Sequence, residues 1–521
     1  MAGVVARSVS RPFVLPTITT EVRDLLIALS FTVVAAAVRL PYLRDIPRLT
    51  DELQEILWAL SIARGEMLPL TAVDSYYGPL WSYLLAVAFR GVGMSDWVPR
   101  LVATIMASLC VGLTYVIGRE IAGRWAAAVG AALLLTSGGH IIITSHTARS
   151  NSMTPVLLLL VAWTLLLAIR RDDGRYLLAT GFLFSLALQS HISAIAFAPG
   201  LVLALLIGRP SLLRSPWLLG AIVGAVLGYS NMILYNIQND FYSLVHAQHM
   251  QQGYTEGKRT DLATYLTNLQ ALLQSLSRLL SGTIDISTSP SRFLYSFAAA
   301  LGLTFLAWRR MWLPLLFCGS AILVLPYFNP RYGPILSGRY LIPLLPFCFI
   351  GIGVSIVWLT RRLPASQALR AGAALLAVCF PLVHLVWYYQ EVLADDRTNA
   401  PLYALSDSVR DLYQPTDLVF LDEVLEQEPL TGGGNDLKAL RMLLETRGLR
   451  YEVVKINQES LTTLNTTGRD AVVIMDNRKR QQVERDARIV ATGAVEASAS
   501  GSGHRYGVFR LSSRLGAGGT R

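Results

Sequence analysis

The chain has 521 residues, of which 53% are hydrophobic and 15% charged, and its mean hydropathy is +0.45. These values exclude a soluble globular protein, because the apolar segments far exceed what one core can bury. The formal net charge of +10 does not by itself indicate nucleic-acid binding, because in a membrane protein the distribution of Arg and Lys matters more than their sum. Several apolar runs of about 18 to 22 residues match the thickness of a bilayer core. The sequence therefore predicts a multi-spanning membrane protein.

The N-terminal tail, residues 1–23, is basic and is expected to be cytoplasmic. The apolar run after it has no small-residue cleavage site, so we expect a retained anchor rather than a signal peptide. Hydropathy and flanking charge predict about eleven spans. They lie near 24–43, 97–118, 125–144, 153–169, 176–190, 191–208, 217–236, 291–308, 313–328, 339–360 and 371–390. Residues 176–208 can also be one bent span, because His191 and Pro199 interrupt them.

The short loops predict the orientation of these spans. With the N-terminus inside, every inner loop carries Arg, as the positive-inside rule requires; these loops are 118–124, 170–175, 208–216, 309–310 and 361–370. Two long segments, 44–96 and 237–290, then lie outside. The apolar stretch 78–93 contains Arg90 and would place the basic loops on the wrong side if it crossed, so we expect a helix at the outer interface. An amphipathic helix is expected near 261–280.

After residue 391 the composition changes from apolar runs to alternating strand and helix patterns. Strands are expected at 417–423, 450–456, 470–476 and 506–512, and helices at 435–447 and 477–487. We interpret 391–513 as a small extracytoplasmic α/β domain and 514–521 as a disordered tail. The glycines of "TGGGND" (431–436) lack the following Lys-Ser/Thr of a phosphate loop and indicate a flexible turn.

The first candidate for chemistry is the carboxylate pair Asp51 and Glu52 in "LTDELQEI", just outside the first span. One interpretation is structural: Asp51 caps a helix, with Gln54 completing a capping-box-like arrangement. The other is catalytic, with both residues in an active site. The two are compatible, because a capping carboxylate is held in place, which a catalytic base also requires.

Three further groups lie at the same predicted membrane face. "HTARSNS" (146–152) contains Arg149 and can either solvate a helix end or belong to a site. His191 is a titratable group at membrane depth, which points to a site unless it is a satisfied core histidine. Arg331, Arg339 and Tyr340 precede a late span. Guanidinium groups suit phosphate oxygens, and interfacial anchoring is the alternative.

Cofactor and metal signals are weak. The four cysteines all fall in predicted spans, without disulfide or metal-ligand spacing. "HAQH" (246–249) has two histidines but no third ligand. We expect no cofactor, and nothing in the sequence supports a divalent metal.

The order of motifs resembles the GT-C membrane glycosyltransferases, specifically glycosyltransferase family 39. This family includes the protein O-mannosyltransferases and the aminoarabinose transferase of lipid A. The resemblance rests on the Asp51–Glu52 pair, then "RGEMLPL", "GPLWSYLLAVAFRGVG", "WVPRLVA" and the later "SGRYLIPLLPF". It covers about residues 24–390 and leaves the C-terminal domain unmatched. The expected fold is therefore an α-helical polytopic membrane protein of GT-C type, with about eleven spans and a small C-terminal α/β domain.

The resemblance implies a donor sugar on a polyprenyl phosphate at the outer face, and a lipid, glycan or protein acceptor. Asp51 matches the family's first acidic residue, which acts as general base, and a single displacement would invert the anomeric centre. Arg149, Arg331 and Arg339 are the expected contacts to the leaving phosphate. Asn151 stands where many relatives carry a second acid, and His191 stands where some carry Lys. The first departure weakens any case for metal dependence.

Three alternatives remain at this point. A transporter or flippase of lipid-linked saccharides predicts paired repeats with broken spans and mid-membrane polar sites, whereas here the ionisable residues gather at one face. A GT-C polymerase or ligase usually carries its important loop late in the chain, whereas here the acidic site comes first. An inactive relative with a partner-binding outer domain is the third. Nucleic acid is not an expected partner. The excess of Arg over Lys is typical of a GC-rich bacterial genome.

Overall fold

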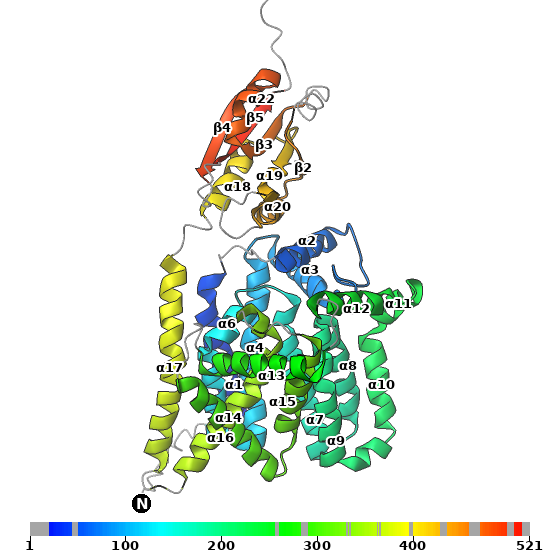
Figure 1. Ribbon diagram of the computed structural model, residues 1–521, viewed down its shortest axis with the longest axis vertical. Coiled ribbons are helices and arrows are strands. Elements are labelled where there is room, and N and C mark those ends of the chain that lie inside the picture. Colours follow the sequence, from blue (N-terminus) through cyan, green and yellow to red (C-terminus); the bar gives the residue numbers. More distant parts are fainter. Residues whose placement is uncertain are drawn as a thin grey trace, which may run out of the picture.

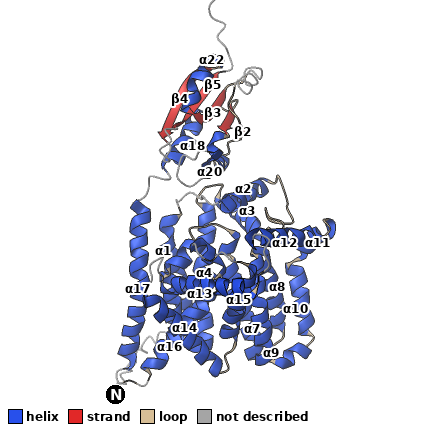
Figure 2. Ribbon diagram, in the orientation of Figure 1, coloured by secondary structure: helices blue, strands red, loops and turns tan. Residues whose placement is uncertain are grey.

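The computed structural model describes residues 20–43, 50–255, 260–282, 290–329, 332, 335–361, 363, 366–394, 400–427, 435–457, 469–497 and 505–512. A bundle of helices forms the larger part, and a smaller part with a β-sheet stands at one end of it (Figures 1 and 2). The turn glycines 432–434 and the tail 514–521 lie outside the described residues.

Every apolar run predicted as a span corresponds to a helix, a pair of helices or a broken helix. These are α1 (Thr20–Arg39), α4 (Val98–Ala122), α5 (Arg124–Thr136), α6 (Gly138–Thr144), α7 (Thr154–Arg171), α8 (Arg175–Ser190), α9 (Ala198–Gly208), α10 (Trp217–Gly228), α11 (Ser230–Gln238), α14 (Pro290–Trp308), α15 (Leu313–Phe328), α16 (Leu345–Thr360) and α17 (Ser366–Ala394). The short 3₁₀ elements η3 (Ile192–Phe197), η5 (Ile335–Tyr340) and η6 (Ile342–Leu344) lead into α9 and α16. His191 thus marks a break between α8 and α9.

By length and hydropathy alone, four helical stretches among the described residues are able to cross a membrane: 98–122, 150–171, 338–360 and 367–390. Two more qualify if the pairs α5–α6 and α10–α11, bent by 60° and 63°, each count as one span. The count of about eleven spans therefore stays a prediction.

Proline marks where many of these helices begin. Pro99, Pro155, Pro199, Pro314 and Pro346 occupy the first turns of α4, α7, α9, α15 and α16. The first turn of a helix has no intrahelical partner for its N–H groups, so the missing proline N–H costs nothing there. The sequence thus sets the start of several helices locally.

Small residues allow the helices to pack closely. At the crossing of α14 and α16, a Cβ added to Gly302 would lie 1.8 Å from the carbonyl oxygen of Gly351. Only glycine fits there, and small residues at such crossings let helix backbones approach within a membrane.

Four helices outside the spans surround one end and one side of the bundle: α2 (Thr50–Arg64), α3 (Leu80–Val92), α12 (Tyr242–Thr255) and α13 (Leu262–Ser281). α2 and α3 lie at the end that faces the sheet, and α13 runs across the bundle (Figure 1). α2 buries Leu53, Ile56 and Leu60 completely. α3 has 13 residues, about 20 Å of helix, which is too short to cross a bilayer core.

The C-terminal part is a five-stranded sheet in the order β2-β1-β3-β5-β4. Its strands are β1 (Leu418–Asp422), β2 (Glu452–Val454), β3 (Ala471–Asp476), β4 (Arg488–Ala497) and β5 (Arg505–Ser512). β1 pairs in parallel with β2 and β3, whereas β5 is antiparallel to β3 and β4. The accompanying helices are α18 (Ala400–Leu412), α19 (Val424–Gln427), α20 (Asp436–Thr446) and α22 (Arg480–Asp486).

The sheet part stands next to the end of the bundle that carries α2 (Figure 1). Arg64, the last residue of α2, pairs with the carboxylate of Glu445 in α20 at 3.2 Å and donates to its carbonyl oxygen at 3.1 Å. The Tyr403 hydroxyl donates to Asp96 at 2.5 Å. The helix that carries Asp51 is therefore tied to the C-terminal part at its opposite end.

Candidate active site

Two of the predicted site residues, Asp51 and Arg149, are joined by an ion pair between Asp51 Oδ2 and Arg149 Nη2. The Asp51 side chain is 52% exposed, whereas that of Arg149 is 11% exposed. α2 begins at Thr50, so Asp51 lies in its first turn rather than at the N-cap position. A carboxylate in the first turn is stabilised by the helix dipole. The pair thus presents a fixed carboxylate at an accessible surface.

Glu52, the neighbouring carboxylate, points into the protein instead. Its Oε1 accepts a hydrogen bond from the Ala148 N–H at 2.5 Å and lies 3.4 Å from Arg100 Nη2, and both side chains are almost fully buried. The indole N–H of Trp81 donates to the carbonyl oxygen of Ala148 at 3.1 Å. The peptide groups on both sides of Ala148 are therefore held directly before Arg149.

A third carboxylate, Glu55, completes this clamp and was not predicted from the sequence. It is 2% exposed and accepts from the Ser150 N–H and hydroxyl at 2.8 Å each, and from the Tyr77 hydroxyl at 2.9 Å. Burial raises the pKa of Glu55 above its ordinary value, although Arg149 and the three hydrogen bonds oppose this. A signal was present: Glu55 follows Glu52 by three residues and precedes buried Ile56, which places it on the buried face.

Tyr77 links the carboxylates to the second group of predicted residues. Its ring centroid lies 6.3 Å from that of His191, and the His191 ring lies 5.3 Å from that of Tyr340. Arg339 donates to the Tyr340 hydroxyl at 2.8 Å. The structure therefore brings five of the predicted site residues into one continuous group, namely Asp51, Arg149, His191, Arg339 and Tyr340, with Tyr77 and Glu55 between them.

The tautomer of His191 follows from its neighbours. The Ser193 N–H donates to His191 Nδ1 at 3.1 Å, and the Ser193 hydroxyl lies 2.9 Å from the same atom. Nδ1 is therefore an acceptor, and a neutral His191 carries its proton on Nε2. This leaves Nε2–H as the hydrogen-bond donor of a residue that lines a cavity.

Charges of both signs act on the titratable residues around this group. Burial raises the pKa of Asp74, and Asp51 adds to this while His246 and Arg149 oppose it. Burial also raises the pKa of Tyr254 in α12; Asp51 adds to this increase, and Arg339 opposes it. Burial lowers the pKa of Arg149, but Asp51 and Glu55 outweigh it and raise that pKa overall. The group thus contains both carboxylates and arginines, and Arg149 carries its full positive charge.

A cavity of about 330 Å³ adjoins this group. η3, α12 and the end of α15 form its walls, and Tyr76, His191 and Tyr340 lie at its polar side. The remaining lining is mostly apolar: Ile192, Ile195, Ala196, Leu244, Ala247, Met250, Leu325 and Phe328. An apolar cavity that ends on polar groups suits an amphiphilic ligand.

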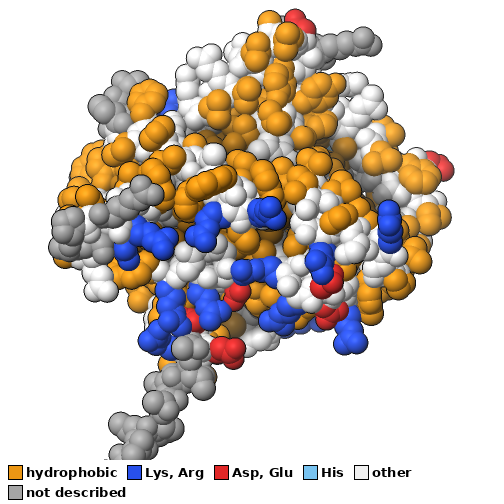
Figure 3. Space-filling model, turned by 90° about the horizontal axis from the view of Figure 1, so that it is seen from below, with side chains coloured by type: hydrophobic (Ala, Val, Ile, Leu, Met, Phe, Trp, Pro, Cys, Tyr) orange, Lys and Arg blue, Asp and Glu red, His pale blue; other side chains and the backbone are white. Residues whose placement is uncertain are grey.

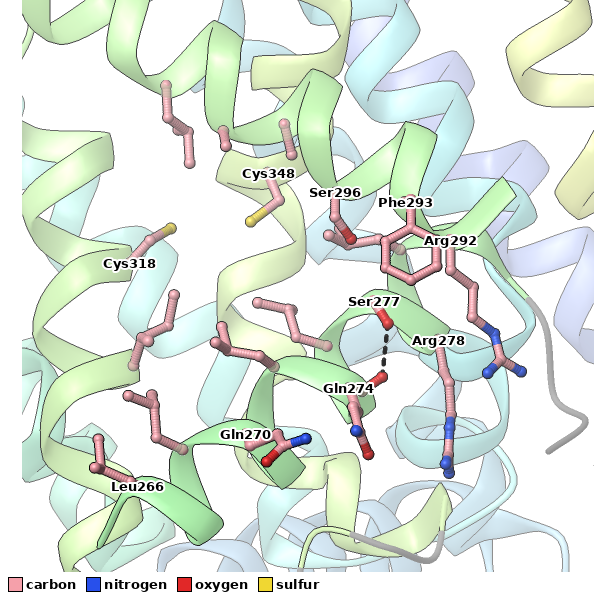
Figure 4. A pocket seen from close by; sticks show the side chains of 18 residues that line it. Leu266, Gln270, Gln274, Ser277, Arg278, Arg292, Phe293, Ser296, Cys318 and Cys348 are labelled. Atoms are coloured by element: carbon pink, nitrogen blue, oxygen red, sulfur yellow. Dashed lines mark hydrogen bonds between the residues drawn. The ribbon is translucent and has the colours of Figure 1, made fainter. Parts of the chain in front are cut away.

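A larger cavity, of about 750 Å³, lies between α13, α14, α15 and α16. Figure 4 shows its apolar walls, with Cys318 and Cys348 on one side and Gln270 and Gln274 on α13. None of its lining residues belongs to the Asp51–Tyr340 group. It is therefore separate from the candidate active site.

Three other residues singled out in the sequence are not part of the Asp51–Tyr340 group. Arg331 lies outside the described residues. His146 Nδ1 lies 3.2 Å from the Tyr388 hydroxyl in α17. His246 bonds to the Ser75 hydroxyl at 2.8 Å. Among the described residues, no group of three or more His, Cys, Asp or Glu side chains is arranged to hold a metal ion.

Comparison with known proteins fits this arrangement. A family model described as "Dolichyl-phosphate-mannose-protein mannosyltransferase" matches residues 77–235. No curated protein matches the chain. The chain is similar to the crystal structure of ArnT from Cupriavidus metallidurans bound to undecaprenyl phosphate, with 14% identity and a TM-score of 0.58 over 96% of this chain and 99% of that one. For ArnT in the apo state, the identity is 14% and the TM-score 0.60, over 94% and 98% of the two chains.

The fold is similar to that of ArnT over nearly the full length of both chains. The family match covers Tyr77, Arg149 and His191. Together they indicate that the chain is a membrane-embedded glycosyltransferase. The predicted fold class and the family resemblance are confirmed, and the transporter alternative is set aside.

Proposed function

We propose that the protein transfers a sugar from a polyprenyl phosphate to an acceptor hydroxyl at the extracytoplasmic face, with inversion at the anomeric carbon. The observation that carries this proposal is the Asp51–Arg149 pair. It places a half-exposed carboxylate, able to accept a proton, beside a guanidinium group, able to bind a phosphate. The acceptor can be a lipid, a glycan or a protein.

Polyprenyl phosphate as the sugar carrier has two supports. The matched family is named for dolichyl-phosphate mannose, and the similar ArnT structure contains undecaprenyl phosphate. Both are phosphates on long isoprenoid chains. In this chain, the apolar cavity of about 330 Å³ accommodates the first part of such a chain. His191 and Tyr340 at its polar side, and Arg339, which donates to the Tyr340 hydroxyl, are the proposed donors for the phosphate.

Asp51 is the proposed general base. Its carboxylate takes the proton of the acceptor hydroxyl as that oxygen attacks the anomeric carbon. In the resting state Asp51 is paired with Arg149. A donor phosphate that binds Arg149 competes with Asp51 for it. Donor binding therefore frees the carboxylate for the acceptor.

The bond between the anomeric carbon and the phosphate oxygen breaks as the new glycosidic bond forms. The electron pair leaves on the phosphate, which is a stable anion and needs no general acid. Arg149 and Arg339 stabilise the charge that develops there, through an oxocarbenium-like transition state. One displacement inverts the configuration of the sugar. Arg331 remains a candidate for the same role.

Glu52, expected as a second catalytic residue, is proposed to position the site instead. Glu52 and Glu55 hold the backbone N–H groups of Ala148 and Ser150, which flank Arg149. These contacts thereby fix the backbone of Arg149 in the position from which its side chain pairs with Asp51. A site whose supporting contacts are loosened by about 1 Å loses much of its rate.

The donor part of this proposal is tested by the binding of undecaprenyl phosphate to the purified protein in detergent. Tyr340→Phe and Arg339→Gln are expected to weaken binding by about tenfold or more, since each removes a donor to phosphate. The matched control is Arg214→Gln, an exposed arginine outside this cavity. Unchanged affinity in both variants would place the phosphate elsewhere.

A further inference from the structure

The membrane face opposite Asp51 carries a pocket that the transfer reaction does not use. It has a volume of about 350 Å³ and lies where α4, α7, α14 and α16 end. Arg170, Arg309 and Arg361 line it, each from a different chain segment. Figure 3 shows this face, on which basic side chains gather and few acidic ones are seen.

The floor of the pocket is apolar. Leu306, Met311, Val354 and Val357 line it, and Trp358 stands at its side, 45% exposed. Tryptophan is typical of the depth at which lipid headgroups meet acyl chains. The pocket therefore offers apolar surface for the acyl chains of a phospholipid and, beside it, arginines for the phosphate.

The charges of the pocket are only partly balanced by the protein. Arg170 donates to the backbone carbonyl of Glu120 at 2.5 Å and to its carboxylate at 3.1 Å. For Arg309 and Arg361, no carboxylate lies within ion-pair distance in the part of the chain that the structure describes. The Arg309 guanidinium lies 6.0 Å from the Phe305 ring centroid. Both guanidinium groups belong to exposed residues and are accessible to a ligand from solution or from the membrane surface.

Helix ends give a simpler explanation for some of these arginines, because cations near a helix C-terminus offset the helix dipole. That explanation covers the charge of Arg170, which donates to the end of α4, and also those of Arg361, the C-cap of α16, and Arg309, which follows α14. It does not account for an apolar hollow between Arg309 and Arg361 with a tryptophan at its side. Basic pockets between membrane helices on the cytoplasmic side are suited to anionic headgroups.

We propose that this pocket binds an anionic glycerophospholipid whose headgroup carries two phosphates, from the leaflet opposite the active site. The two guanidinium groups of Arg309 and Arg361 match the two phosphates. One acyl chain lies along the apolar floor beside Trp358. The site is independent of the proposed sugar transfer, because none of its lining residues belongs to the Asp51–Tyr340 group.

The test uses the full-length protein, delipidated in detergent, with cardiolipin as the probe and phosphatidylethanolamine and inorganic phosphate as comparisons. Cardiolipin is expected to bind and to raise the Tm. The double variant Arg309→Gln/Arg361→Gln is expected to bind it about tenfold more weakly or worse. The control is Arg175→Gln/Arg214→Gln, which removes the same charge from exposed arginines outside the pocket. Its affinity is expected to stay within about twofold of wild type.

Fluorescence gives a second readout that a poorly folded variant does not mimic. Brominated cardiolipin is expected to quench part of the tryptophan emission of the wild type, and Trp358→Phe is expected to lose that part. Equal losses of binding in the two double variants would contradict the proposal and indicate general attraction to a basic face. Equal binding of phosphatidylethanolamine, or displacement of the lipid by inorganic phosphate, would also overturn it.

Discussion

Asp51 and Arg149 form an ion pair across 98 residues of sequence, between the first turn of α2 and the segment that leads into α7. The pair is half-exposed on the Asp51 side, and exposed ion pairs contribute little to stability. Behind it, Glu52 and Glu55 are buried and bind the backbone on either side of Arg149. The three carboxylates of α2 therefore divide into one that faces outward and two that hold its partner.

This division predicts effects on stability of very different size for the two neighbouring residues. Asp51→Asn is expected to change the free energy of unfolding by less than about 1 kcal/mol. Glu52→Gln leaves the buried Arg100 charge without its carboxylate and is expected to cost about 3 to 5 kcal/mol. Thermal unfolding of both purified variants measures the difference. Equal Tm losses would mean that Asp51 is as much part of the fold as Glu52.

Arg149 is expected to need its guanidinium shape and not only its charge. Arg149→Lys keeps the charge but loses the fork that binds a carboxylate or phosphate through two N–H groups. We expect kcat/KM for sugar transfer to fall by about a hundredfold, or about 2.7 kcal/mol. Steady-state kinetics with a lipid-linked donor measure it. Near wild-type kinetics for Arg149→Lys would show that this reaction needs only a positive charge at position 149.

Glu55 predicts a pH dependence of stability. Burial raises its pKa above the ordinary value of 4.5, so the folded protein holds this proton more tightly than the unfolded chain. The contribution of Glu55 to stability is therefore greatest below the unfolded-state pKa and is lost as pH rises through the folded-state pKa. Glu55→Gln removes this dependence. Relative to wild type, the variant is expected to gain in Tm as pH rises.

Thermal unfolding from about pH 5 to about pH 8 checks this prediction, because this range lies above the unfolded-state pKa. Glu66→Gln serves as the matched control, since it removes the same charge from an exposed site. Parallel curves for wild type and Glu55→Gln would show that Glu55 holds its proton equally in both states.

The far end of α2 offers a test of how the helix is held. Arg90 in α3 donates to the carbonyl oxygens of Ala63 at 2.8 Å and Ile62 at 3.1 Å, which are among the last of α2. Arg90→Gln leaves these carbonyls to water and is expected to cost about 1 kcal/mol. The measurement is the Tm, with Arg175→Gln as control. An unchanged Tm for Arg90→Gln would mean that the contact from α3 does not stabilise the end of α2.

The sequence predicted those parts of the molecule that have a local pattern. Apolar runs with arginines at their ends located the helices, and Asp51 stood out because a carboxylate pair there is unusual. Glu55 was missed because a single acid in an amphipathic pattern is normally solvated. Tyr77 carries no local signal at all, since its role depends on contacts with α2 and His191.

β4 shows a different limit of sequence patterns. Its register with β5 shifts between Ile489 and Ala491 and again between Thr492 and Val495, which breaks the alternation that marks a strand. Gly493 packs against Ser408 of α18, a contact that only the folded chain makes. The other four strands have short, regular apolar patterns and were located correctly.

The most direct measurement is mass spectrometry of envelope glycans and polyprenyl-phosphate sugars in a deletion strain. The strain is complemented with wild type or with Asp51→Asn, at matched expression and matched Tm. If Asp51 is the base, the variant loses one sugar from the envelope and accumulates the corresponding lipid-linked sugar. If Asp51→Asn restores the glycans fully, Asp51 serves only the first turn of α2, and the proposed mechanism is wrong.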